Sequence, residues 1–130
     1  QVYWHPSALP TWALLRRASF VSYEQGAGLL FNRGTAIDYG RRTWLLERIS
    51  FQEQICKVIA ALPGAGDEDF RACFPSEALI TTVCTAKLAP DFLIFEKRLA
   101  RGWVAEWTAQ DPNGKPLYTF HLHNCAAYRN

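Results

Sequence analysis

The turn Asp111-Pro112-Asn113-Gly114 is the sequence feature that most constrains how this chain folds. Asp in the first position, Pro in the second and Gly in the fourth favour a type I turn followed by a left-handed glycine. Alternating apolar and polar residues flank the turn, WVAEWTAQ over 103–110 and LYTFHLHNC over 117–125. Two such segments joined by a short loop must pair antiparallel, so a β-hairpin is predicted.

The register of this hairpin divides its side chains between two faces. With a loop over 111–116 and no bulge, the predicted apolar face pairs Trp107 with Phe120, Ala105 with Leu122, Ala109 with Tyr118 and Trp103 with Asn124. The predicted polar face pairs Glu106 with His121, Val104 with His123 and Thr108 with Thr119, and ends at Cys125. The residues able to do chemistry therefore gather on the polar face.

Glu106 and His121 are the candidate catalytic residues. A carboxylate beside an imidazole fixes its tautomer and lets it act as a general acid or base near neutral pH. No nucleophile can be identified beside them, and GxSxG, Walker-type, HExxH and Rossmann motifs do not occur. The competing interpretation is a cross-strand pair on a wet face, which contributes ~0.2 to 1 kcal/mol. Whether the chain is an enzyme is left open.

A metal site is the second hypothesis for the polar face. His121, His123 and Cys125 occupy alternate positions, with Glu106 as a fourth group, and these residue types suit zinc. The same alternation is typical of any half-exposed strand, and Cys125 is also a candidate for a disulfide. We therefore expect no metal and no other cofactor.

A pocket for a small molecule is the third hypothesis. If the sheet curves, a few polar groups converge among aromatic side chains, which is the usual composition of a ligand site. The candidate ligand-binding residues are Trp103, Trp107, Phe120 and His123 in the hairpin, with Tyr39 at a cavity mouth. His5, which stands beside Pro6, is interpreted as incidental.

A helix is predicted over 51–62. Ser50 and Glu53 have the spacing of a capping box, which places the start of the helix at Phe51, and Pro63-Gly64 ends it. Its apolar residues recur at helical spacing and form one predicted core stripe, Phe51, Ile55, Val58, Ile59 and Leu62. In the simplest arrangement, this helix packs on the aromatic face of the hairpin.

The segments before this helix are less regular. Residues 1–10 form a predicted extended arm, Thr11 caps a predicted short helix, and 29–31 is a predicted strand. The segment 43–49 fits either a strand or the front of a long helix.

The segments after it predict a sheet. Residues 64–75 are interpreted as a polar loop, whereas the β-branched run 78–88 and the segment 92–100 are predicted strands. Together with the hairpin, these strands make a four-stranded meander.

One α+β domain over 1–130 follows from this order: a single curved antiparallel sheet, the C-terminal four-stranded meander, packed on a helix. The element order over about 27–128 resembles NTF2-like, cystatin-like and hot-dog domains, in which an antiparallel sheet wraps one helix. The likeness concerns architecture and rests on no family motif, so it implies no catalytic residue.

Charge narrows the choice of partners. The 130 residues include 14 basic and 12 acidic ones, and a net charge of +2 indicates neither nucleic acid nor a membrane as partner. The pairs Arg16-Arg17 and Arg41-Arg42 are interpreted as solvated positions rather than phosphate sites. We expect a small-molecule ligand and leave a homodimer open.

The cysteines bear on the compartment. Cys56, Cys73, Cys84 and Cys125 are candidates either for two disulfides, with three alternative pairings, or for four buried thiols. The chain starts at Gln1 and contains no Met, which favours a secreted or otherwise processed chain; localisation stays open.

Three functions remain. The first is binding of a hydrophobic or aromatic small molecule in a cavity between helix and sheet. The second is a cofactor-independent isomerase, dehydratase or thioester hydrolase that uses His121 and Glu106 on the same scaffold. The third is a secreted protein-interaction domain with two disulfides, whose exposed aromatic side chains bind another protein.

Overall fold

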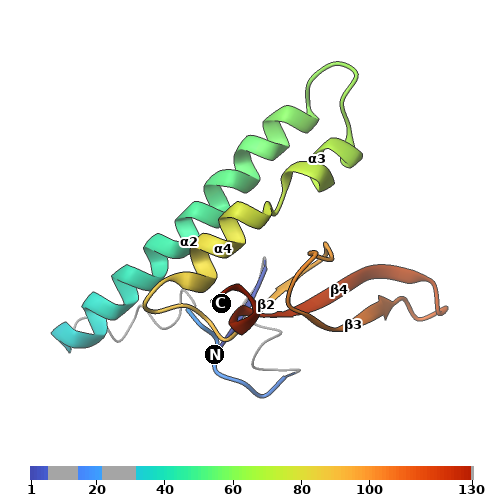
Figure 1. Cartoon of the computed structure of the whole chain (residues 1–130). Helices are drawn as coiled ribbons and strands as arrows, with labels where there is room; N and C mark the ends of the chain where they lie inside the picture. Colours follow the sequence, from blue (N-terminus) through green and yellow to red (C-terminus); the bar gives the residue numbers. More distant parts are fainter. Residues whose placement is uncertain (6–14, 22–31, 130) are drawn as a thin grey trace.

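The computed structural model describes residues 1–5, 15–21 and 32–129 and has the predicted α+β class (Figure 1). The predicted helix capped by Thr11 and the predicted strand at 29–31 lie outside the described residues. The elements in chain order are β1 (Val2–Trp4), α2 (Arg33–Ala60), α3 (Asp67–Cys73), α4 (Glu77–Thr85), β2 (Phe92–Phe95), β3 (Trp103–Gln110), β4 (Pro116–Asn124) and the 3₁₀ helix η2 (Cys125–Tyr128).

The four strands form one open, mixed sheet with the order β1-β2-β4-β3. Strand β1 runs parallel to β2, whereas β2 with β4 and β3 with β4 are antiparallel. The predicted antiparallel meander is therefore wrong in two respects. Its fourth strand is β1, which lies within the predicted arm, and β2 pairs with β4 rather than with the strand that follows it.

The segment 78–88, predicted as a strand, begins as helix α4. Ser76 caps this helix, because its Oγ accepts a hydrogen bond from a backbone N–H three residues on at 3.2 Å. The hydroxyls of Thr81, Thr82 and Thr85 donate to carbonyl oxygens four residues earlier, so the helix itself satisfies them. The apolar residues Ile80, Val83 and Cys84 are then buried together. This packing outweighs a β propensity that spans only about 1 kcal/mol.

Helix α2 is a single helix of 28 residues that contains the ambiguous segment 43–49. It begins after Asn32, whose side-chain oxygen accepts hydrogen bonds from the backbone N–H groups of Gly34 and Thr35 at 2.8 and 3.1 Å. The predicted start at Phe51 is wrong, because Ser50 lies inside the helix and has no end to cap. The predicted end before Pro63 agrees with the last helical residue, Ala60.

The predicted core stripe of this helix faces outward. Phe51 and Val58 are 69% and 67% exposed, and Ile55, Ile59 and Leu62 are exposed as well. The buried residues lie on another side of the helix, at Leu45, Ile49 and Cys56. Apolar residues occur on both sides of α2, so helical spacing alone does not identify the inner one.

The predicted polar loop 64–75 contains helix α3. Its three acidic residues, Asp67, Glu68 and Asp69, occupy the first turn, where carboxylates interact favourably with the helix dipole. The Asp69 carboxylate also accepts a hydrogen bond from the Gly66 N–H at 2.9 Å. The acidic cluster therefore begins a helix, a role that composition alone did not indicate.

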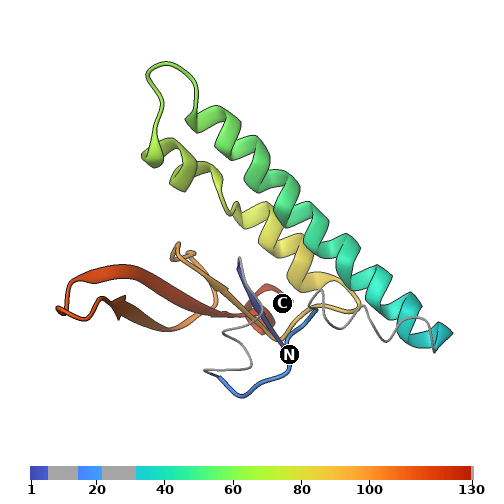
Figure 2. The same ribbon diagram turned by 180° about the vertical axis from the view of Figure 1, so that it is seen from behind.

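The helices and the sheet form two layers (Figures 1 and 2). The core between the layers contains buried side chains from α2, α4 and β2, including Ile49, Ile80, Leu93 and Phe95. On the other face of the sheet, the ring of Trp4 lies 5.3 Å from the rings of both Trp107 and Phe120. The predicted packing of the helix on the aromatic face is therefore wrong, because Trp4 from β1 covers that face.

The hairpin register is confirmed along most of its length and wrong at its open end. Trp107 with Phe120, Ala105 with Leu122, Ala109 with Tyr118, Glu106 with His121 and Thr108 with Thr119 pair as predicted. A bulge between Trp103 and Ala105 puts Trp103, not Val104, opposite His123. Trp103 therefore moves to the face that carries His123 and does not pair with Asn124.

Two disulfides, Cys56–Cys73 and Cys84–Cys125, account for all four cysteines. The first joins α2 to the end of α3. The second joins α4 to the residue that follows β4, and so it links the helical layer covalently to the sheet.

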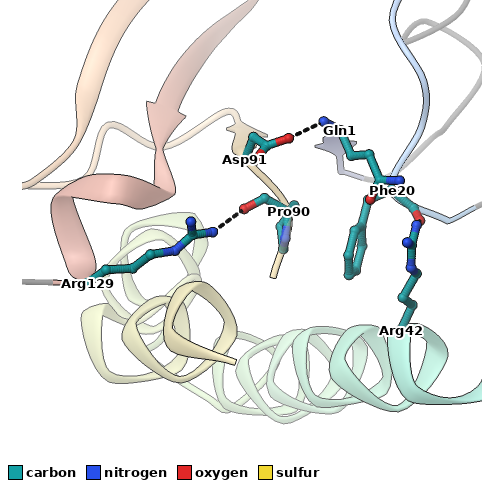
Figure 3. Close-up of polar contacts among 6 residues, drawn as sticks. All are labelled: Gln1, Phe20, Arg42, Pro90, Asp91 and Arg129. Atoms are coloured by element: carbon teal, nitrogen blue, oxygen red, sulfur yellow. Dashed lines mark hydrogen bonds and ion pairs between the residues drawn. The ribbon is translucent and has the colours of Figure 1, made fainter. Parts of the chain in front are cut away.

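Polar contacts add to these links (Figure 3). They join the Gln1 amine to the Asp91 carboxylate, Arg129 to the Pro90 carbonyl at 3.2 Å, and Arg42 to the Phe20 carbonyl at 2.9 Å. The first two contacts hold the segment before β2 to both ends of the chain. The third ties the segment after β1 to α2.

Removal of the Cys84–Cys125 disulfide is expected to cost more stability than removal of Cys56–Cys73. The linked residues are 41 and 17 positions apart, and the longer loop restricts the unfolded chain more. Replacing both cysteines of a pair by Ala should lower the free energy of unfolding by about 4 kcal/mol for Cys84–Cys125 and by about 3 kcal/mol for Cys56–Cys73. Guanidinium denaturation measures both, and the reverse ranking would contradict this account.

Gly102→Ala is expected to destabilise the protein by about 2 to 3 kcal/mol. Gly102 has φ +72°, and an added Cβ lies 2.7 Å from the backbone oxygen of Asn124. Gly114→Ala is the matched control, because Gly114 has φ +82° but open space around it, and we expect a loss of about 1 kcal/mol there. Thermal unfolding compares the two; equal losses would show that the contact with Asn124 is unimportant.

Candidate functional site

The predicted catalytic pair comes together in the structure. Glu106 on β3 lies opposite His121 on β4, with its Oε2 3.3 Å from Nδ1 of the imidazole. The side chain of His121 is 12% exposed and that of Glu106 is 50% exposed, so the pair extends from the edge of the core to solvent. Its use in catalysis stays a prediction.

His123 is fully buried on the same side of the sheet. Its Nδ1 lies 3.4 Å from the carbonyl oxygen of Arg101, and its Nε2 has no hydrogen-bond partner within the described ranges. Burial lowers the pKa of His123, although the carbonyl groups of Arg101 and Lys97 and the carboxylate of Glu77 favour the charged form. We infer that this imidazole is neutral at pH 7.

The metal hypothesis loses its thiolate, because the sulfur of Cys125 is bonded to Cys84. The rings of His121 and His123 lie 6.5 Å apart. Over residues 1–5, 15–21 and 32–129, no group of three or more His, Cys, Asp or Glu side chains is placed to hold a metal ion.

The predicted ligand-binding residues lie in separate places. Trp107 and Phe120 pack on the sheet face away from the helices. Trp103 stacks with Arg98, whose guanidinium carbon is 4.2 Å from the ring centroid. Tyr39 on α2 packs against a different buried cluster, around Leu45. These side chains therefore do not line one common pocket.

A cleft of about 760 Å³ opens between the helices and the sheet. Helices α2 and α3 contribute one wall, and β2 with the start of β4 contributes the other; Figure 1 shows the tip of the hairpin diverging from the helices on this side. Its apolar lining is Phe70, Phe74, Pro75, Phe95, Leu117 and Tyr118, and its polar lining is His5, Glu53, Lys57, Asp67, Arg71, Glu96, Lys97 and Thr119. His121 is a neighbour of the cleft, because its register partner Phe95 lines it.

His5 belongs to a series of four contacting polar side chains, of which His5, Glu53 and Lys57 line this cleft and Tyr3 does not. The Tyr3 hydroxyl lies 3.1 Å from Nδ1 of His5, and Nε2 of His5 lies 3.4 Å from the carboxylate of Glu53. The other carboxylate oxygen of Glu53 is 2.6 Å from Nζ of Lys57. With a neutral imidazole, Tyr3 donates to Nδ1 and the Nε2–H donates to Glu53.

Burial determines the charge of the His5 and Tyr3 side chains. The ring of His5 lies 5.2 and 5.7 Å from the rings of Phe74 and Phe95. This burial lowers the pKa of His5, although the neighbouring carboxylate of Glu53 favours the charged form. Burial also raises the pKa of Tyr3. The cleft thus contains an uncharged His5, with Tyr3 hydrogen-bonded to it, next to the Glu53–Lys57 ion pair.

Sequence reasoning missed this site, since it interpreted His5 as incidental and Glu53 as part of a capping box. Two signals were present. Glu53 and Lys57 have the spacing of an ion pair along a helix, and Tyr3 and His5 flank Trp4 as alternate residues of a strand. Neither signal reveals that the two segments meet.

No protein-family model, curated protein or solved structure matches this chain. The function of the site therefore has to be argued from its geometry. In the part of the chain that the structure describes, no helix has the combination of length and apolar character that a membrane crossing requires.

Stability is expected to fall as the pH drops below about 6.5, the ordinary pKa of histidine. The pKa values of His5 and His123 are lowered in the folded protein, so between those values and 6.5 the unfolded chain binds more protons. Stability is therefore fully present above this window and is lost within it, by up to about 1.4 kcal/mol per pH unit for each histidine.

The variant His123→Asn tests this prediction, because it removes one titrating group. Chemical denaturation at several pH values should give a shallower slope below pH 6.5 than in the wild type. Leu99→Ala, which truncates a buried residue that does not titrate, is the control and should keep the full slope. An unchanged slope in His123→Asn would refute the role of this imidazole.

Proposed function

We propose that this protein binds a small hydrophobic or aromatic molecule in the cleft between α2, α3 and the sheet. The cleft itself carries the proposal. Its volume of about 760 Å³ lies within the range of ligand pockets, and a few hydrogen-bonding side chains converge on it among aromatic rings. This keeps the expected cavity between helix and sheet but gives it a different lining.

The charges around the cleft favour an uncharged or zwitterionic ligand. Three basic side chains, Lys57, Arg71 and Lys97, balance three acidic ones, Glu53, Asp67 and Glu96. Lys97 is already engaged, because its Nζ donates to the carbonyl oxygens of Ala72 and Pro75 at 3.2 and 3.1 Å. The ligand would place an apolar body on Phe70 and Phe74 and a polar group beside the Glu53–Lys57 pair.

Binding suits this cleft better than catalysis. Both ring nitrogens of His5 are engaged, by Tyr3 and Glu53, so the imidazole has no nitrogen ready to accept a substrate proton. The enzymatic alternative, an isomerase, dehydratase or thioester hydrolase, would use His121 and Glu106, which do not line the cleft. Loss of turnover in His121→Ala with the fold intact would favour it.

We also propose that the architecture of this protein is similar to that of NTF2-like, cystatin-like and hot-dog domains. The long helix α2 above one face of a sheet supports it. The parallel strand β1 and the second helix α4 beside α2 depart from a single helix wrapped by an antiparallel sheet.

A protein-interaction domain is the second candidate. Two disulfides and the exposed apolar side chains of α2 favour it. Secretion is part of this second proposal, because disulfides form and persist mainly in oxidising environments such as the outside of the cell.

The uncharged fluorescent probe N-phenyl-1-naphthylamine tests the proposed cleft. We expect saturable one-to-one binding that is weakened at least about tenfold in Leu117→Glu, because a carboxylate would then lie against the apolar body of the probe. Leu117 is 54% exposed, so the substitution leaves the core untouched.

Two controls separate the cleft from other apolar surface. Val104→Glu changes a 50% exposed residue of β3 outside the cleft, and Phe51→Ser removes an exposed ring from the outer side of α2. Both should bind the probe as the wild type does. Wild-type affinity in Leu117→Glu would overturn the proposal.

A further inference from the structure

Helix α2 runs along the outer edge of the molecule (Figures 1 and 2). Its outer side carries large exposed apolar side chains. Ile37, Trp44, Phe51 and Val58 recur every seven residues, and Ile55 and Leu62 lie four residues after the last two. Alternating steps of three and four residues are typical of the seam between two packed helices. The proposed ligand cleft uses none of these side chains.

The exposed area is comparable with that of a stable interface. The six side chains of this outer stripe are between 44% and 69% exposed. Given their sizes, they leave on the order of 700 Å² of apolar surface per molecule, close to the ~800 Å² that each partner of a standard interface buries. The largest apolar patch of a typical monomer is smaller, about 300 to 600 Å².

We propose that this outer stripe binds a second copy of the chain, with the two α2 helices packed antiparallel around a two-fold axis at the middle of the helix. The heptad positions then pair across the interface. Phe51 faces Arg48 of the second copy, Ile55 faces Trp44, Val58 faces Arg41 and Leu62 faces Ile37.

Charge selects the antiparallel arrangement. Arg41 and Arg48 occupy seam positions in the first half of α2, so a parallel pair would place each beside its own counterpart. In the antiparallel pair each faces an apolar residue, and the two copies of Arg41 lie about 25 Å apart along the helix, whereas the two copies of Arg48 lie close to the two-fold axis. The guanidinium carbon of Arg48 already lies 4.1 Å from the ring centroid of Trp44, where a buried charge interacts favourably with the aromatic face.

The shape of the helix surface is self-complementary in this arrangement. A shallow groove of about 520 Å³ beside the first half of α2 is lined by Ile37, Trp44 and Leu88 among others. The second half carries the exposed side chain of Val58, and Leu62 is exposed two residues beyond the end of the helix. A two-fold interface needs one surface to fit itself, and here Leu62 of the second copy faces the groove at Ile37.

Sedimentation equilibrium of the full chain, with both disulfides intact, tests the proposal. We expect a wild-type dimer and a dissociation constant raised about a hundredfold in Val58→Arg, because the new guanidinium lies against Arg41 of the second copy. Val104→Arg is the matched control: it changes an exposed valine of β3 and should leave the dimer unaffected. Circular dichroism verifies that Val58→Arg, at a 67% exposed position, stays folded.

Charge reversal tests the orientation. Adding Arg41→Glu to Val58→Arg should restore the dimer, since each new carboxylate faces a new guanidinium in the antiparallel pair. In a parallel pair, these positions are about 25 Å apart along the helix and no rescue occurs. Absence of rescue therefore overturns the antiparallel arrangement.

Two further results would overturn the second copy as the partner: a wild-type monomer at concentrations up to about 100 µM, or an unchanged dimer in Val58→Arg. Binding of N-phenyl-1-naphthylamine by the monomeric variant tests the ligand cleft separately, because Val58 does not line that cleft.

Discussion

Strand β2 is buried on both of its faces, and the arrangement of the other elements follows from the need to cover it. Leu93, Ile94 and Phe95 are at most 1% exposed, and successive side chains of a strand point to opposite faces. The helical layer buries Leu93 and Phe95, whereas Trp4 of β1 packs with Ile94 on the other face. Full burial of one such side chain stabilises the fold by about 1.5 to 3 kcal/mol. The Cys84–Cys125 disulfide joins the helical layer to the sheet beside this strand.

Helix α2 has apolar residues on two sides but covers the sheet with only one of them. Ile49 and Cys56 face the core, while Phe51 and Val58 face away from it. Between these sides, Glu53 and Lys57 reach the cleft, where Glu53 meets His5 from the first strand. The helix therefore connects both proposed binding surfaces, the ligand cleft and the outer stripe. An apolar side that the sheet cannot cover is explained if a second helix covers it.

The functional proposals depend on contacts between segments that are distant in the sequence. The contacting side chains Tyr3, His5, Glu53 and Lys57 come from the first strand region and from the middle of α2. The aromatic rings around them come from the end of α3 and from β2. The hairpin pair of Glu106 and His121, by contrast, lies within one local unit. Reasoning from the sequence found the local pair and missed the distant one, because only the local pair is set by strand spacing and turn chemistry.

The sequence by itself determined the α+β class, the hairpin around Asp111 to Gly114 and most of its register, because turn residues and strand alternation act over a few neighbouring positions. It also limited the cysteines to a few alternatives. Only the tertiary structure decided the disulfide pairing, the helical state of the β-branched segment 78–88 and the side of α2 that faces the core. Packing selects among local conformations that differ by about 1 kcal/mol per residue or less. A helix with two apolar sides can be oriented only by what lies next to it, which here is the doubly buried strand β2.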